Sequence, residues 1–129
     1  MEIVAVDTNV VVRFLVDDTP SEAKRARRLF ETHRIHLAES VLLETEWVLR
    51  AVYAFSPTEI SIALRSLLRL STVCVDDRAA LLQVLDWFDQ GLDFADALHY
   101  ARSTGLEFKT FDKKFISKGR KNGFKISAP

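Results

Sequence analysis

The amino-acid sequence predicts an α/β fold: a three-layer α/β/α sandwich with a central parallel sheet of about four to five strands. The alternation of two kinds of segment predicts it. Short apolar segments alternate along the chain with longer segments in which apolar residues recur at the spacing of helices. Strands that alternate with helices form parallel pairs through crossover connections, with helices on both faces of the sheet. The length of 129 residues suits one domain, so residues 1–129 are expected to share a single core.

The expected strands are short and apolar. The first, at 2–6, ends at the polar sequence Asp7-Thr8-Asn9, which is typical of a strand that stops at a turn and continues into a capped helix. The other strands are expected at 35–38, 72–75, 108–111 and 124–126.

The expected helices are marked by their caps and their apolar faces. Ser56, Pro57 and Glu59 are typical of a helix start, with a capping side chain, a proline in the first turn and a nearby acid. Gly91 is expected to end one helix, and Asp93 to cap the next. The segment before the last strand is expected to be a glycine-containing basic loop. The helices are placed after Asp7, from Ser21 with a basic outer side, at 40–53, from Pro57, from Asp77 to Gln90 and from Asp93.

Composition and charge narrow the classes of function. The single cysteine, Cys74, rules out an internal disulfide, and a Cys/His zinc site is not expected, so the sequence fits a reducing, cytoplasmic setting. No apolar run approaches the roughly 18 to 20 residues that span a bilayer, so neither export nor membrane insertion is expected. The net charge is zero, but residues 109–125 hold seven basic residues and one acid, a surplus of +6. Such a segment is either a footprint for phosphates or a solubilising tail.

Four acids stand where a parallel sheet can bring catalytic side chains together. Asp7 and Asp112 each follow a predicted strand, so both are expected at the carboxyl edge of the sheet, where ligands bind in this architecture. Asp96 lies in the first turn of a helix, and Glu44 lies in an apolar stretch of another helix. Acids that converge repel one another, and a hard divalent cation such as Mg²⁺ or Mn²⁺ offsets this repulsion.

Each acid also has a purely structural interpretation. Asp7 can simply cap the helix that follows. Asp93 and Asp96 have the spacing of an N-cap and the third helical position, which explains both without chemistry, and Asp93 is assigned no further role. A carboxylate such as Glu44 among apolar residues needs a partner, unless Glu44 lies at the helix edge and Glu46 is the exposed acid. The residues alone leave these alternatives open.

Four motifs in this order resemble those of PIN domains and, within that family, the VapC toxins of bacterial and archaeal toxin–antitoxin pairs. Residues 4–15 (VAVDTNVVVRFL) resemble the opening strand and its acidic turn, and residues 40–50 (SVLLETEWVLR) the second motif. Residues 94–99 (FADALH) resemble the third motif and residues 110–115 (TFDKKF) the fourth. Each motif is common alone, but four in order over nearly the whole chain are specific.

The resemblance implies a metal-dependent endoribonuclease that cleaves single-stranded RNA with a water activated by Mg²⁺ or Mn²⁺. It also implies a homodimer, and a cognate antitoxin protein whose helix fills an apolar groove. The catalytic and metal-binding residues that it implies are Asp7, Glu44, Asp96 and Asp112, with hydrogen-bonding support from Thr8, Asn9 and Thr110.

Basic side chains must then hold the RNA, because carboxylates repel its backbone. Lys113 and Lys114, directly after Asp112, are the leading candidates, and Arg13 is a weaker one. The aromatic residues at helical spacing with aliphatic ones are expected in core or dimer packing rather than against bases; they are Trp47, Trp87 and Phe88.

Other interpretations fit the sequence less well. A phospho-receiver domain needs adjacent acids after the first strand, but Asp7 is followed by Thr8. A phosphatase of the haloacid dehalogenase type needs a second Asp two residues after the first, where this chain has Asn9. A non-toxin PIN-type nuclease in RNA processing is the main alternative to a toxin. An inactive PIN-like domain that only binds a partner is disfavoured because all four acids are present.

Overall fold

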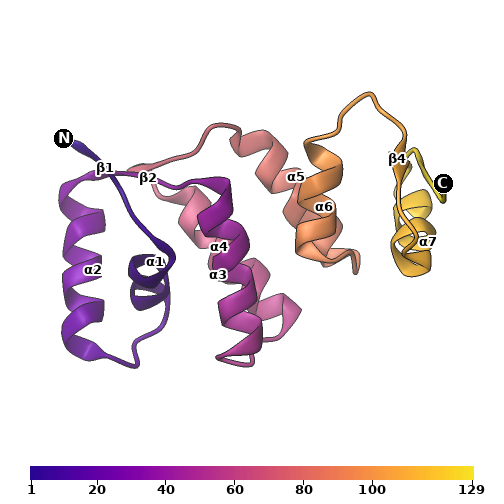
Figure 1. Ribbon diagram of the computed structural model, residues 1–129. Helices are drawn as coiled ribbons and strands as arrows, with labels where there is room; N and C mark the ends of the chain where they lie inside the picture. The colour runs from indigo at the N-terminus through magenta and orange to yellow at the C-terminus, as the bar shows by residue number, and fades with distance from the viewer. The chain divides into compact units, whose positions relative to one another are not determined.

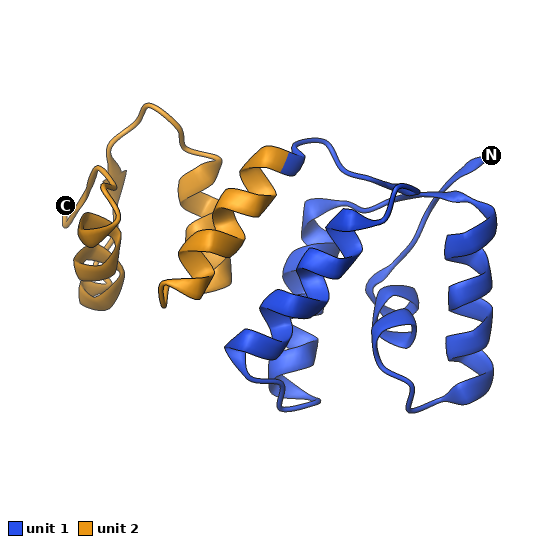
Figure 2. Cartoon of the chain, turned by 180° about the vertical axis from the view of Figure 1, so that it is seen from behind, with its two compact units in different colours: residues 1–78 blue, residues 79–129 orange.

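The computed structural model describes residues 1–129, and the chain divides into two compact units, Met1–Arg78 and Ala79–Pro129 (Figure 2). None of the helices has the length and apolar character that a membrane span requires. The elements of the first unit, with the start of the second, run in the order β1 (Ile3–Ala5), α1 (Thr8–Leu15), α2 (Pro20–Thr32), β2 (Arg34–His36), α3 (Glu39–Ala51), α4 (Pro57–Arg69), β3 (Val73–Cys74) and α5 (Arg78–Asp89) (Figure 1). The chain continues with α6 (Phe94–Ala101), β4 (Phe108–Lys109), α7 (Lys113–Lys121) and β5 (Ile126–Ser127).

The first unit contains a three-stranded parallel sheet in the order β1-β2-β3. Ile3 pairs with Arg34, and Ile35 with Val73. The helices α1 and α2 connect β1 to β2, and α3 and α4 connect β2 to β3. Because all three strands run the same way, Asp7 and the start of α3 follow strands that end at one edge of the sheet. The core beneath these helices is aliphatic, with fully buried side chains at Val11, Ile35, Leu37, Leu49, Ile60, Leu64 and Leu67.

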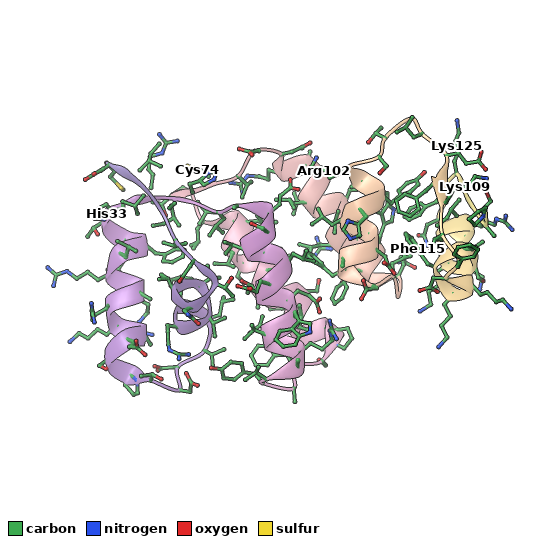
Figure 3. All side chains as sticks on the ribbon, in the orientation of Figure 1. His33, Cys74, Arg102, Lys109, Phe115 and Lys125 are labelled. Carbon is green, nitrogen blue, oxygen red and sulfur yellow. The ribbon has the colours of Figure 1, made fainter.

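The second unit is organised around aromatic side chains and a two-stranded parallel sheet, β4 with β5. The ring of Phe124 stacks on that of Tyr100 with 3.8 Å between the ring centroids. It forms a T-shaped pair with the ring of Trp87, with 4.6 Å between the centroids. Phe115 on α7, labelled in Figure 3, is buried with its ring 5.3 Å from that of Phe108. Trp87 and Phe88 therefore pack in the core of this unit, one of the two predicted alternatives, whereas Trp47 in the first unit is exposed.

Helix caps appear where the sequence predicts them. Ser56 accepts a hydrogen bond from the Glu59 amide at 3.1 Å, and the Glu59 carboxylate accepts one from the Ser56 amide at 2.9 Å, which completes a capping box for α4. Gly91 ends the helical segment with a φ of 98°, a left-handed conformation that favours glycine. Asp93 caps α6.

The α/β class with parallel strands is confirmed, but one detail of the prediction is wrong. Five strands of two or three residues each are present, three paired in the first unit and two in the second. The segment predicted as a basic loop is the helix α7. Glycines in this segment favour a loop, but Gly119 is buried within α7, where its lack of a side chain lets the helix approach Phe124 and Ile126.

Candidate functional site

Asp7 is exposed and forms the N-cap of α1. Its Oδ1 accepts a hydrogen bond from the amide of Val10 at 3.2 Å, so the capping interpretation is correct as far as it goes. The other carboxylate oxygen makes no hydrogen bond and faces solvent, so it remains available to a ligand. The predicted supports differ in burial, since Thr8 is buried whereas Asn9 is exposed.

Glu44 and Glu46 occupy opposite faces of α3. Residues two positions apart, such as these, are separated by roughly 200° around a helix of 3.6 residues per turn. Glu46 is the buried acid, with its side chain 3% exposed, and its Oε2 accepts a hydrogen bond from Nε of Arg50 at 2.8 Å. Glu44 is exposed and unpaired, so of the two acids it is Glu46, and not Glu44, that lies among apolar residues and needs a partner. An exposed carboxylate needs no internal partner and can serve a ligand.

Asp96 is half-buried in the first turn of α6, among other acids. Its own amide donates to Oδ1 of Asp93 at 3.0 Å, which confirms Asp93 as the cap. Partial burial raises the pKa of the Asp96 carboxyl, and repulsion from Asp93 and Asp112 raises it further, whereas His99 acts in the opposite direction. The carboxylate itself makes no hydrogen bond or ion pair. A carboxylate in these surroundings would favour a bound cation.

Asp112 lies between β4 and α7, and both its side chain and its backbone amide make hydrogen bonds. Its Oδ1 accepts a hydrogen bond from the amide of Phe115 at 3.0 Å, which caps α7. The amide of Asp112 donates to the hydroxyl of Thr110 at 3.1 Å, so Thr110 supports this acid. Lys113 and Lys114 are the first two residues of α7, both exposed and without an ion-pair partner.

The side chain of Arg13 is already engaged within its own unit. Its Nε donates to Glu22 at 3.1 Å, one terminal nitrogen donates to the hydroxyl of Tyr53 at 3.2 Å, and Asp18 lies 3.6 Å away. These partners raise the pKa of the guanidinium, with the hydrogen bond to Glu22 as the largest cause. Because its charge is balanced internally, Arg13 is a weaker candidate for binding RNA than the two lysines of α7.

The four candidate acids are thus divided in pairs between the units: Asp7 and Glu44 in the first, Asp96 and Asp112 in the second. Within neither unit do three or more His, Cys, Asp or Glu side chains form a cluster that could hold a metal ion. The donors are all carboxylate oxygens, with the hydroxyl of Thr110 beside one of them. This set fits a hard cation such as Mg²⁺ or Mn²⁺ and does not fit zinc held by sulfur and imidazole.

Comparison with known proteins decides the family. The model of the PIN domain matches residues 4–121, which include all four acids and parts of both units. The chain belongs to the PIN domain family. PIN domains are generally nucleases, hydrolases that cut phosphodiester bonds. No curated protein and no solved structure matches the chain.

Some charged residues of this PIN domain were not singled out by sequence reasoning. Arg25 and Arg28 on α2 face a pocket beside α1, and neither has an ion-pair partner. The available signal was the run of basic residues at 24–28, which the sequence identifies only as the outer side of a surface helix. Which of them face a pocket depends on how α2 packs on α1, and periodicity alone does not give that.

Proposed function

We propose that this PIN domain is a metal-dependent endoribonuclease that cleaves single-stranded RNA, and that Asp7, Glu44, Asp96 and Asp112 supply its acidic site. The family match supports the nuclease part, because it spans the positions of all four acids. The observation that carries the proposal is the environment of Asp96: a half-buried carboxylate repelled by two neighbouring acids and bonded to no cation. Such an arrangement costs stability and is typical of a functional site.

The residues of the chain suit this chemistry. Mg²⁺ or Mn²⁺, when bound by these carboxylates, would supply the charge neutralisation at the phosphodiester and the activation of water that hydrolysis needs. Asp7 and Asp112 each use one oxygen to cap a helix, which fixes the carboxylate and leaves the second oxygen for a ligand. Thr110 holds the backbone of Asp112 from the other side.

The lysines after Asp112 support the RNA part of the proposal. Positive charges in the first turn of a helix oppose its macrodipole, at a cost of about 0.3 to 1 kcal/mol each. Lys113 and Lys114 begin α7, which has no acid in its first turn, so they do not serve the stability of this helix. Unpaired cations beside an acid that binds metal are suited to holding the phosphates on either side of the cleaved bond.

We further propose that the protein is the toxin of a VapC-like toxin–antitoxin pair and forms a homodimer. The support is the set of motifs shared with that subfamily, together with exposed apolar side chains on α3, on the residue after it and on α4. These are Trp47, Val52 and Ile62, with exposed fractions of 54%, 63% and 62%. An adjacent reading frame for a small antitoxin would favour this role over a PIN-type nuclease of RNA processing.

The experiment that tests the nuclease proposal compares Asp96→Asn with Asp93→Asn. Asn caps a helix about as well as Asp, so Asp93→Asn should fold, and the Asp96 carboxylate makes no hydrogen bond, so Asp96→Asn should fold as well. We expect wild type and Asp93→Asn to cleave single-stranded RNA with added Mg²⁺ or Mn²⁺, and excess EDTA to stop them. Asp96→Asn should be inactive under all conditions. Cleavage that persists in EDTA, or an active Asp96→Asn, would contradict the proposal.

A further inference from the structure

A pocket of about 660 Å³ lies between α1 and α2, entirely within the first unit. The two helices pack side by side (Figure 1), and His33, labelled in Figure 3, marks the end of α2. The helix α1 contributes Asn9 and Arg13, and α2 contributes Glu22, Arg25 and Arg28. The volume is within the range of pockets that hold small molecules or single residues of a polymer.

The pocket carries a surplus of positive charge. Three arginines and one glutamate line it, which gives a net charge of +2. Arg13 takes up the charge of Glu22 through the hydrogen bond of 3.1 Å. Arg25 and Arg28 are exposed and make no ion pair or hydrogen bond through their side chains. The surplus therefore lies on these two guanidinium groups.

Helix stability does not account for this arrangement. Like charges three residues apart on a helix repel each other. Glu22, three residues before Arg25, could have balanced one of them, but it is bonded to Arg13 instead. Two uncompensated guanidinium groups that line one pocket are suited to an anion, and arginine binds phosphate with two parallel hydrogen bonds.

The inner wall of the pocket is apolar. Val10, Ala26 and Leu29 line it, with Ala26 buried and the other two half-buried. Asn9 adds an amide that both donates and accepts hydrogen bonds. A ligand with an anionic group, polar edges and flat apolar faces fits this lining, and a nucleotide has all three.

The pocket begins beside a candidate catalytic acid. Asn9 and Val10 belong to the helical turn that Asp7 caps, and the amide of Val10 donates to Asp7. One turn of helix is about 5.4 Å long. Lys24 and Arg27 do not line the pocket, and Arg27 lies 4.0 Å from Asp17 instead. The place of the pocket beside Asp7 suits the strand that carries the cleaved bond better than a separate small ligand.

We propose that the α1–α2 pocket binds the backbone of the RNA strand next to the bond that is cleaved, with Arg25 and Arg28 holding its phosphates. This rests on the proposed function, since it assigns part of the substrate site of the same nuclease. Arg13 is a positioning residue here: it occupies Glu22 and so leaves the other two arginines free for the strand.

The test compares two double variants of the full chain. Arg25→Gln/Arg28→Gln removes two charges from the pocket, and Lys24→Gln/Arg27→Gln removes two from the same helix at positions that do not line it. Binding of a labelled single-stranded RNA is measured in EDTA, so that no cleavage occurs, over a series of salt concentrations. Thermal melts check that both variants fold.

We expect the pocket variant to bind at least about ten times more weakly near 0.1 M salt, and to lower the slope of log K against log salt by about 1.4, since each phosphate contact of a single strand contributes about 0.7. The control variant should stay within about threefold of wild type. Equal weakening in both variants, or in neither, would overturn the proposal. So would a pocket variant that keeps RNA binding and loses binding of a polyglutamate peptide, because the pocket would then serve an acidic protein segment.

Cleavage of the same RNA by wild type with Mg²⁺ separates this proposal from the proposed function. Binding that depends on the pocket without any cleavage would sink the nuclease proposal and leave the pocket assignment standing. Cleavage together with unchanged binding by the pocket variant would overturn the pocket assignment alone. A wild-type protein that binds no RNA would overturn both.

Discussion

The two units share one way of placing an exposed aspartate, but they differ in how they accommodate an acid that is removed from solvent. In each, an aspartate follows a parallel strand and caps the next helix through a hydrogen bond from its carboxylate: Asp7 with Val10, and Asp112 with Phe115. The first unit neutralises its one buried acid, Glu46, with Arg50. The second unit half-buries Asp96 near Asp93 and Asp112, which repel its carboxylate, and only His99 acts in the opposite direction.

This difference separates structural acids from candidate functional ones. A buried and paired carboxylate serves the fold, and its removal leaves a buried charge unmatched. An acid that is exposed, or that other acids repel, contributes little or nothing to folding. The comparison therefore predicts that neighbouring acids on one helix have opposite effects on activity and on stability.

The largest expected effect is the loss of cleavage in Glu44→Gln. This acid is exposed and unpaired, so the variant should melt as wild type does while its cleavage rate falls roughly 100-fold or more, the scale on which loss of one charge-stabilising group slows catalysis. RNA cleavage with Mg²⁺ and a thermal melt measure the two quantities.

Glu46→Gln is the matched control for that prediction. It replaces a charged hydrogen bond to Arg50 with a neutral one in a buried position, so it should lose about 1 kcal/mol of unfolding free energy and keep its activity. If Glu46→Gln were the inactive variant and Glu44→Gln the destabilised one, the assignment of the two acids would be reversed.

A smaller effect is expected in the packing of the second unit, at Gly119. A Cβ there would lie 2.9 Å from Cδ2 of Phe124 and 3.2 Å from Cγ2 of Ile126, and Phe124 cannot withdraw because Tyr100 stacks on it. Overpacking costs about 1 to 3 kcal/mol, and the better helix propensity of alanine returns just under 1 kcal/mol. Gly119→Ala should therefore lose about 1 kcal/mol of unfolding free energy.

Ser117→Ala, at an exposed position of the same helix, is the control for Gly119→Ala. It should leave the denaturant midpoint unchanged or slightly raised, because alanine is the better helix former. A Gly119→Ala protein that is more stable than wild type would show that Phe124 can move, and that the aromatic packing is looser than the structure indicates.

The same residues show how far the sequence predicts this fold. The capping box of α4 was predictable because Ser56 and Glu59 act within one helical turn, and the start of α6 was predictable from Asp93 for the same reason. Local chemistry decides such features. The α7 helix was missed because Gly119 has its role in contacts with Phe124 and Ile126, which are tertiary.

The candidate site was predicted only in part, for a similar reason. The motifs identify all four acids, and the family match covers them. They do not tell which acid on α3 is buried, because Glu44 and Glu46 are both flanked by apolar residues and only the packing of α3 separates them. Nor does the sequence show that Arg13 is already bonded to Glu22, nine residues away, while Arg25 and Arg28 remain unpaired.

The smallest expected effect, and the most direct test of the crowded acids, is the pH dependence of stability in metal-free protein. Partial burial and repulsion from Asp93 and Asp112 raise the native pKa of Asp96 above its ordinary value of 3.8. Below that value the carboxyl is protonated in both the folded and the unfolded states and has no effect. As the pH rises from that value through the native pKa, the carboxyl ionises more readily in the unfolded state than in the folded state, so the free energy of unfolding falls.

Asp96→Asn removes this penalty and should be more stable than wild type at pH 7, by roughly 0.5 to 1 kcal/mol; solvent screening of a partly exposed group keeps it at the lower end of single stabilising changes. The advantage should shrink toward zero near pH 4. Added Mg²⁺ should reverse the ranking at pH 7, because a cation that binds only folded wild type stabilises it by RT ln(1 + [L]/Kd). Thermal melts of both proteins at pH 4 and 7, with and without Mg²⁺, measure all three outcomes. An advantage of equal size at both pH values would mean that repulsion among Asp93, Asp96 and Asp112 is not its cause, and the contrast between the two units would then lose its electrostatic basis.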